Sequence, residues 1–109
     1  MAYDERLAER VKPLVMMRPG FSEKKMFGGL AWLLNGNMCV GIHKDRLIFR
    51  LGKEDGAAAL SEPHVGPMDI TGRPMKGWVM VRQEGLEESA DIQRWVERAI
   101  AFVETLPAK

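Results

Sequence analysis

The sequence predicts an α+β fold, in which helices cover an antiparallel sheet in the order αβββαββα. Three observations support this fold class. Apolar residues recur at helical spacing near both ends of the chain, short apolar runs between turn residues fill its middle, and an Asn-Gly pair at 35–36 joins two of these runs. This order of elements places the helices mainly against one face of the sheet.

The first predicted element is a helix that begins near Asp4, a residue type suited to the N-cap. Pro13 lies inside this helix, where it removes one hydrogen bond and clashes with the carbonyl four residues earlier. We therefore expect a kink or two short helical pieces, or alternatively a helix that stops near Lys12. The apolar side chains on one face of the helix are Leu7, Val11, Leu14 and Val15.

Three strands are predicted next, at residues 26–34, 38–42 and 47–51. The Asn-Gly pair at 35–36 predicts a tight hairpin, because both residues tolerate the positive φ of a type I′ turn. The two glycines at 28–29 indicate a bulge or a close approach of another backbone or a ligand. The third strand carries apolar residues in succession, so we expect it to be largely covered on both faces.

The second half of the chain predicts a short helix at 53–60, a loop at 61–67, and a hairpin-like pair of strands at 68–70 and 77–81. A final helix follows Ser89, which we assign as its N-cap. Its apolar residues recur at steps of three and four, and they are Ile92, Trp95, Val96, Ala99, Ile100, Val103 and Leu106.

Length and composition bound the class of protein. The chain has 109 residues, of which 46% are hydrophobic and 28% charged, as expected for one globular domain over residues 1–109. The longest apolar run is far shorter than the roughly 20 residues of a membrane-spanning helix. Acidic residues occupy the N-terminus, where a signal peptide is apolar, and Cys39 is the only cysteine. We therefore expect a cytoplasmic protein in a reducing compartment that does not bind a membrane.

The net charge is only +1, but it is distributed unevenly along the chain. Residues 24–82 hold nine basic and five acidic residues, whereas residues 83–109 hold three basic and six acidic residues. Proteins that bind nucleic acids usually concentrate positive charge on one face. This modest excess gives only weak support to direct nucleic-acid binding.

The residues that commonly carry catalysis or metal ions do not form a recognisable site. Cys39 and His43 alone provide too few ligands for a structural zinc site, and Cys39 fits better as a packed strand residue. His64 lies in a loop beside a proline, where a solvated histidine is the simpler interpretation. No nucleophile elbow, Walker loop or pair of carboxylates is present. We therefore predict no catalytic residues, no metal site and no enzymatic activity.

Two segments, KKMFGG at 24–29 and TGRPMKGW at 71–78, share cations, glycines and large apolar side chains. If the first strand lies near the last hairpin, their four cations meet around Phe27 and Trp78 and form a surface for an anion or an acidic partner. The alternative is that these cations only solvate strand ends and loop edges. The candidate interaction residues are Lys24, Lys25, Phe27, Gly28, Gly29, Arg73, Lys76 and Trp78.

The eight methionines also have two interpretations. Apolar side chains in predicted strands usually face inward, which favours core filling. Met75 and Met80 lie near Trp78 in the sequence and are the candidates for a flexible recognition surface.

The segments KKMFGG at 24–29, NGNM at 35–38 and MDITGRPMKGW at 68–78 together resemble the N-terminal domain of the TfoX family, also called Sxy. The resemblance covers nearly the whole chain. It implies an α+β fold similar to type III secretion chaperones. Full-length members have a further C-terminal helical domain, so a chain ending at Lys109 resembles a stand-alone N-terminal-type protein.

The family resemblance also implies a function. TfoX proteins regulate natural competence genes together with the cyclic-AMP receptor protein, and the resemblance transfers no catalytic residue and no cofactor. We expect a non-catalytic regulatory module that binds a transcription-related protein, and we include a homodimer because chaperone-like folds often dimerise. The alternatives are a small-ligand or anion-binding protein that uses the Lys/Arg/Gly cluster, and a protein with minor nucleic-acid contacts.

Overall fold

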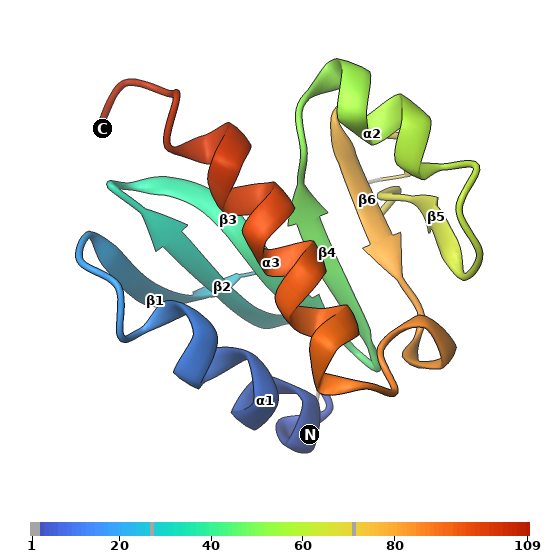
Figure 1. Ribbon diagram of the computed structural model, residues 1–109, viewed down its shortest axis with the longest axis horizontal. Helices are drawn as coiled ribbons and strands as arrows, with labels where there is room; N and C mark the ends of the chain where they lie inside the picture. The colour runs from blue at the N-terminus through green and yellow to red at the C-terminus, as the bar shows by residue number, and fades with distance from the viewer. Residues whose placement is uncertain (1–2, 27, 71) are drawn as a thin grey trace.

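The computed structural model describes residues 3–26, 28–70 and 72–109. Within these residues six antiparallel strands form one sheet in the order β1-β2-β3-β4-β6-β5 (Figure 1). The elements are α1 (Glu5–Val15), β1 (Phe21–Met26), β2 (Gly29–Leu34), β3 (Asn37–His43), β4 (Arg46–Arg50), α2 (Lys53–Ala59), β5 (Val65–Pro67), β6 (Trp78–Val81), a 3-10 turn η1 (Gln83–Gly85) and α3 (Ser89–Val103).

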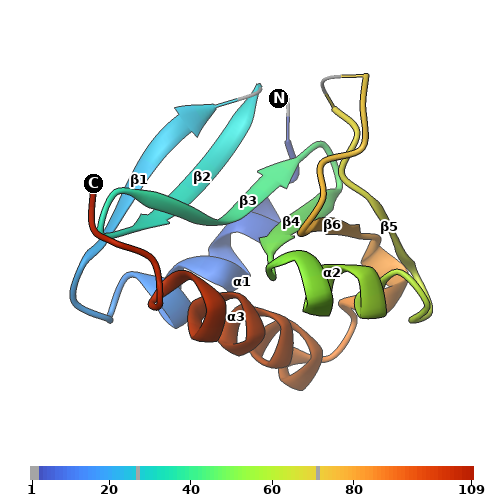
Figure 2. The same cartoon turned by 90° about the horizontal axis from the view of Figure 1, so that it is seen from above.

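All three α-helices lie on one side of the sheet, and α1 and α3 cover its face (Figure 2). The main core lies between them and the strands, with Trp32 and Val11 fully buried. The rings of Phe49 on β4 and Trp95 on α3 stack with their centroids 5.7 Å apart. This arrangement confirms the predicted α+β class and the placement of helices against one face.

A second, smaller apolar cluster lies on the opposite face of the sheet. The loop between β5 and β6 rises on this side (Figure 2), and its Met68 is fully buried. Met68 packs with Met38, Ile48 and Met80, and Met75 contacts the cluster from the loop. Core filling is therefore confirmed for Met80, and β4 is covered on both faces as predicted.

The structure has one strand more than the sequence predicted before α2. Residues 21–26 form β1, which pairs along its whole length with β2 at the edge of the sheet. Its central residues, Ser22 to Lys25, are polar and exposed, so they lack the alternation that marks a half-buried strand. The predicted first strand thus begins at Gly29 instead of Met26.

The second hairpin forms, but its first strand is β5 and not the predicted segment 68–70. The sequence predicts a loop at 61–67, and the structure shows that Gly66 and Pro67, residue types that seldom occur within strands, belong to β5. Pro67 is tolerated because β5 is the outermost strand of the sheet. Met68 follows the strand and fills the second cluster instead of pairing with β6.

The predicted hairpin turn and the first N-cap are confirmed. Asn35 and Gly36 both have positive φ, at 53° and 84°. The Asp4 side chain accepts hydrogen bonds from the backbone N–H groups of Arg6 and Leu7. The turn between β2 and β3 and the start of α1 are thus fixed by local sequence.

Some predicted features of the helices are wrong. Helix α1 continues through Pro13 to Val15 as one element, so it neither divides into two pieces nor stops near Lys12, because the proline lies in the last turn and few further hydrogen bonds depend on it. Helix α3 is capped by Glu88 and not by Ser89, with a reciprocal capping box to Asp91. A glutamate at the N-cap is unusual, which is why the serine was the better candidate from sequence.

Candidate functional site

A groove runs along α2, between this helix and the segment that leads into β6. It encloses about 380 Å³. One wall is formed by Lys53, Gly56, Ala57 and Leu60, and the other by Pro67 and residues 74–78. Most of the lining is apolar, and the two lysines Lys53 and Lys76 are its charged residues. We call this feature the α2 groove.

A smaller cavity of about 180 Å³ adjoins the α2 groove and shares Lys53, Lys76, Gly77 and Trp78 with it. Its remaining lining residues are Arg50, Gly52 and Phe102. We call this cavity the cationic recess, since three basic side chains line it. No carboxylate among the described residues lines either cavity.

Arg50 is held in the cationic recess by aromatic rings instead of by an acid. Its guanidinium carbon lies 5.0 Å from the ring centroid of Trp78 and 5.9 Å from that of Phe102. Such contacts orient a guanidinium without neutralising its charge. In the part of the chain that the structure describes, neither Arg50 nor Lys53 nor Lys76 forms an ion pair. The recess is therefore a concentration of uncompensated positive charge.

Three glycines allow α2 to approach the start of β6 closely. Gly52 and Gly77 have φ values of 89° and 88°, which L side chains rarely adopt. The Gly77 carbonyl accepts hydrogen bonds from the backbone N–H groups of Leu51 at 2.8 Å and Gly52 at 3.1 Å. A Cβ on Gly56 would lie only 2.8 Å from the Gly77 Cα. Gly77 is therefore explained by its positive φ and by the close approach of Gly56.

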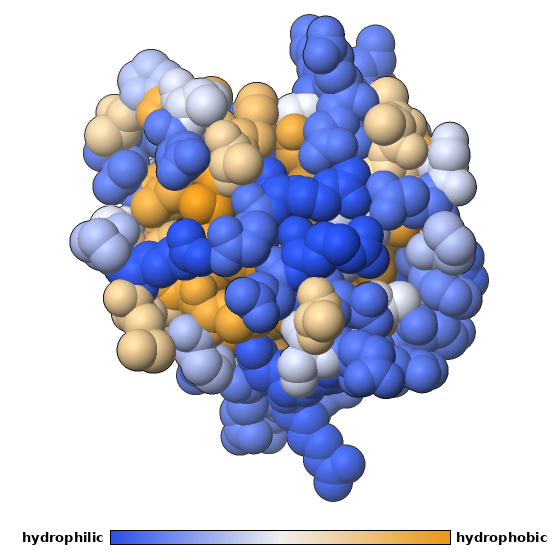
Figure 3. Space-filling view, viewed as in Figure 1, coloured by the Kyte–Doolittle hydropathy of each residue, from blue (hydrophilic) through white to orange (hydrophobic). Residues whose placement is uncertain are grey.

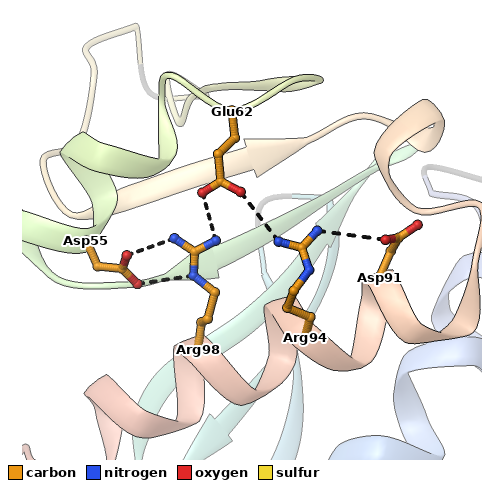
Figure 4. A network of polar contacts seen from close by, with 5 residues as sticks. All are labelled: Asp55, Glu62, Asp91, Arg94 and Arg98. Carbon is orange, nitrogen blue, oxygen red and sulfur yellow. Dashed lines mark hydrogen bonds and ion pairs between the residues drawn. The ribbon is translucent and has the colours of Figure 1, made fainter.

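Helix α2 is tied to α3 by Arg98, which binds two carboxylates (Figure 4). Its guanidinium donates to both oxygens of Asp55, at 2.7 and 3.3 Å, and to Glu62 at 2.8 Å. Glu62 also accepts from Arg94 at 3.4 Å. The guanidinium of Arg98 stacks 4.5 Å from the ring centroid of Trp95. The hydrogen bond to Asp55 is the main cause that raises the pKa of Arg98 above its ordinary value.

This network has two consequences for the α2 groove. It fixes the helix that forms one wall, because Asp55 belongs to α2 and Glu62 follows it. It also engages both carboxylates in ion pairs with Arg98 of α3. Figure 3 shows a hydrophilic band that crosses the middle of the helix-covered face.

The structure places the predicted interaction residues in two separate regions. Lys76 and Trp78 line the α2 groove and the cationic recess. Lys24 and Lys25 lie on β1, and the three strands β2, β3 and β4 separate β1 from β6. The first strand and the last hairpin are therefore not neighbours in the sheet, and the meeting of the four cations stays a prediction.

The two lysines on β1 also point to opposite faces. Lys24 pairs with Ala31, whose side chain belongs to the second cluster, and Lys25 pairs with Leu30, whose side chain belongs to the main core. Both lysines are exposed. They do not form a paired cationic site.

The remaining predicted residues have structural roles or lie elsewhere. Gly28 has a φ of 73° in the turn between β1 and β2, and a Cβ on Gly29 would lie 1.9 Å from the carbonyl oxygen of Ile42. The expected close backbone approach at these glycines is thus found. Arg73 is exposed in the loop before β6, and Phe27 lies outside the described residues.

Sequence reasoning missed Arg50, Lys53 and Phe102 as members of the site. Arg50 was placed in a strand and Phe102 in a helix, and no local pattern shows that their side chains meet. The Gly52-Lys53 pair at the predicted start of α2 was the one available signal, since a glycine beside a helix terminus permits a close approach.

Cys39 is fully buried in β3, as predicted for a packed strand residue. Burial raises the pKa of its thiol to about 12, so the reactive thiolate is disfavoured. His64 is exposed, and its backbone carbonyl accepts from the Arg82 N–H at 3.0 Å. Within residues 3–26, 28–70 and 72–109, no three His, Cys, Asp or Glu side chains could hold a metal ion together.

None of the described helices has the length and hydropathy needed to cross a bilayer.

Residues 14–103 match the family model of the TfoX N-terminal domain, and this match covers most of the chain. No curated protein and no solved structure matches. The predicted similarity to type III secretion chaperones therefore stays a prediction.

Proposed function

Since the chain belongs to the TfoX N-terminal domain family, we propose that it is a regulatory protein-interaction module that acts on transcription without catalysis of its own. The observation that carries this proposal is the family match, which spans the three motifs that the sequence shares with TfoX proteins. The partner is a transcription-related protein in the cytoplasm, such as the cyclic-AMP receptor protein. Natural competence genes are the first regulatory target to test.

The geometry supports an interaction role in two ways. The α2 groove exposes an apolar surface on a wall that Arg98 and the glycines hold in place, and preformed surfaces lose less entropy on binding. The fully buried Cys39 is a poor nucleophile, because burial raises the pKa of its thiol. Binding therefore accounts for the exposed features better than catalysis does.

The experiment that tests this proposal is affinity capture from the native cytoplasm, followed by identification of the retained proteins. We expect a transcription factor or polymerase component to be enriched over an unrelated bait of similar size. Deleting the gene is expected to change transcript levels of the genes that this partner controls. Capture of no such component, together with unchanged transcripts, would contradict the proposed function.

A second candidate function is the binding of a small anion, and the cationic recess is the observation that favours it. Three basic side chains around about 180 Å³, without a lining carboxylate, would accept a carboxylate or phosphate group. A ligand that binds only the folded state at a hundred times its Kd raises stability by about 2.7 kcal/mol. A thermal-shift screen of anionic metabolites that finds no stabilisation at high concentration would exclude this candidate.

Homodimer formation also belongs to the proposal, because a regulatory module can bind its partner as a pair. Sedimentation velocity at rising protein concentration tests it directly. We expect the sedimentation coefficient to increase with concentration, and a constant monomer value would contradict the dimer alone.

A further inference from the structure

We propose that the α2 groove and the cationic recess together bind a short acidic segment of the partner protein in extended conformation. A carboxylate of this segment occupies the cationic recess, and an apolar side chain two residues away occupies the α2 groove. This inference rests on the proposed function as an interaction module, and it adds the docking site and the chemistry of the partner.

Charge complementarity selects an acidic partner. Arg50, Lys53 and Lys76 line one cavity, and none of them is in an ion pair with another described residue. Asp55, a carboxylate of α2 that does not line the groove, is bound by Arg98. A carboxylate from outside therefore meets three cations without first displacing an internal acid.

The apolar lining selects the second feature of the segment. Leu60 is 44% exposed, and Met75 and Trp78 are half-buried beside it in the same groove. Methionine side chains adapt to different apolar shapes, and tryptophan often dominates the binding energy of interfaces. The groove thus suits a leucine, methionine or phenylalanine side chain of the partner.

The combined length of the groove and recess favours a short extended segment of the partner. The groove and recess follow α2 from Lys53 to Leu60, a distance of about 10 Å at 1.5 Å per helical residue. An extended chain advances about 3.3 Å per residue, so roughly three residues span this length. Side chains two residues apart point the same way in such a segment. The recognised pattern is therefore one acidic residue, one spacer and one apolar residue, in either direction.

The inference is tested by NMR titration of the ¹⁵N-labelled full chain with synthetic ten-residue peptides. Two probe peptides carry glutamate and leucine with one serine between them, in the two possible orders, within a serine-glycine background. We expect at least one of them to shift the backbone amide signals of Gly52, Gly56 and Gly77 and the indole signal of Trp78. Lysine in place of the peptide's glutamate, or serine in place of its leucine, is expected to weaken binding at least tenfold.

Matched charge reversals in the protein locate the site. The double variant Lys53→Glu, Lys76→Glu is expected to bind the better probe at least tenfold more weakly. The control Lys24→Glu, Lys25→Glu makes the same change of net charge on β1 and is expected to bind within twofold of wild type. Both variants are first shown to be folded by their dispersed NMR spectra.

Several outcomes would overturn the inference. These are the absence of any groove shift at millimolar concentrations of both probes, equal binding of the lysine peptide, and equal weakening in the two double variants. Groove shifts caused by decanoate, an anion with an apolar chain, but by neither peptide would assign the site to a small ligand instead.

Affinity capture separates this inference from the proposed function. If wild type and the Lys53→Glu, Lys76→Glu variant retain the same transcription-related partner equally, the groove inference fails and the proposed function stands. If wild type retains no such partner while the peptide binds with the expected specificity, the proposed function fails and the chemistry of the groove stands.

Discussion

At the residue scale, Gly56 shows that local propensity and tertiary packing oppose each other. Alanine normally stabilises a helix interior relative to glycine by roughly 0.5–1 kcal/mol. Here the added Cβ would lie 2.8 Å from the Gly77 Cα, a backbone atom that cannot rotate away. We expect Gly56→Ala to lower the free energy of unfolding by about 1–3 kcal/mol, measured by urea denaturation.

The control for this substitution is Gly66→Ala. An added Cβ there meets no atom within 4 Å, so the free energy of unfolding should change by less than about 0.5 kcal/mol. A stabilised Gly56→Ala variant would show that α2 and the start of β6 separate without cost.

Cys39 gives a prediction about pH. Burial raises the pKa of its thiol from 9.0 to about 12, so between these values the unfolded chain has released a proton that the folded chain retains. The protonated thiol therefore makes its full contribution to the free energy of unfolding below pH 9. This contribution decreases as the pH rises above 9, because deprotonation then stabilises the unfolded state. We expect the stability difference between wild type and Cys39→Ala to narrow from pH 8 to pH 10.5, as measured by urea denaturation. A constant difference would mean that the thiolate is tolerated in the core.

At the scale of elements, the attachment of α2 to α3 depends on Arg98. Its side chain is only 23% exposed and donates to two carboxylates, whereas that of Arg94 is 52% exposed and its contacts are longer. We expect Arg98→Ala to cost about 1–2 kcal/mol of folding free energy and to accelerate hydrogen exchange of the α2 amides. Arg94→Ala, the control on the same helix, should cost less than about 1 kcal/mol. If both variants lost the same folding free energy, the attachment of α2 to α3 would not depend specifically on Arg98.

The elements also show how far the sequence alone leads. The helices, the hairpin turn at 35–36 and the buried strand β4 were predictable because apolar periodicity and turn chemistry are local signals. β1 was missed because an edge strand with polar side chains leaves no such signal. β5 was missed because Pro67 is acceptable only at an edge, and the position of an edge is a property of the whole sheet.

For the whole molecule, only part of the candidate site could be predicted from the sequence. Lys76 and Trp78 were selected because their segment combines cations with glycine and large apolar residues. Their actual partners, Arg50 and Phe102, come from elements more than twenty residues away along the chain. Lys24 and Lys25 share the composition of that segment but lie across three intervening strands. Similar composition therefore did not imply adjacent strands in the sheet.

Both outer strands of the sheet are poor templates for further strands. Adjacent charged residues occupy β1, and β5 has only three residues, of which Pro67 lacks an N–H. We expect the variant Lys24→Val, Lys25→Val to form larger species than wild type at the same concentration in sedimentation velocity, whereas Lys24→Gln should behave like wild type. Unchanged behaviour of the double valine variant would show that the charges on β1 do not prevent association.

The composition of these outer strands also restricts how the protein can assemble. A dimer built by joining two sheets edge to edge would bring the lysines of one β1 beside those of a second copy, or would place a proline where a hydrogen-bond donor is needed. Assembly must instead use side-chain surfaces, such as the α2 groove, whose contacts depend on shape and charge. Such contacts discriminate between partners, whereas backbone pairing would accept almost any exposed strand and would lead toward fibres.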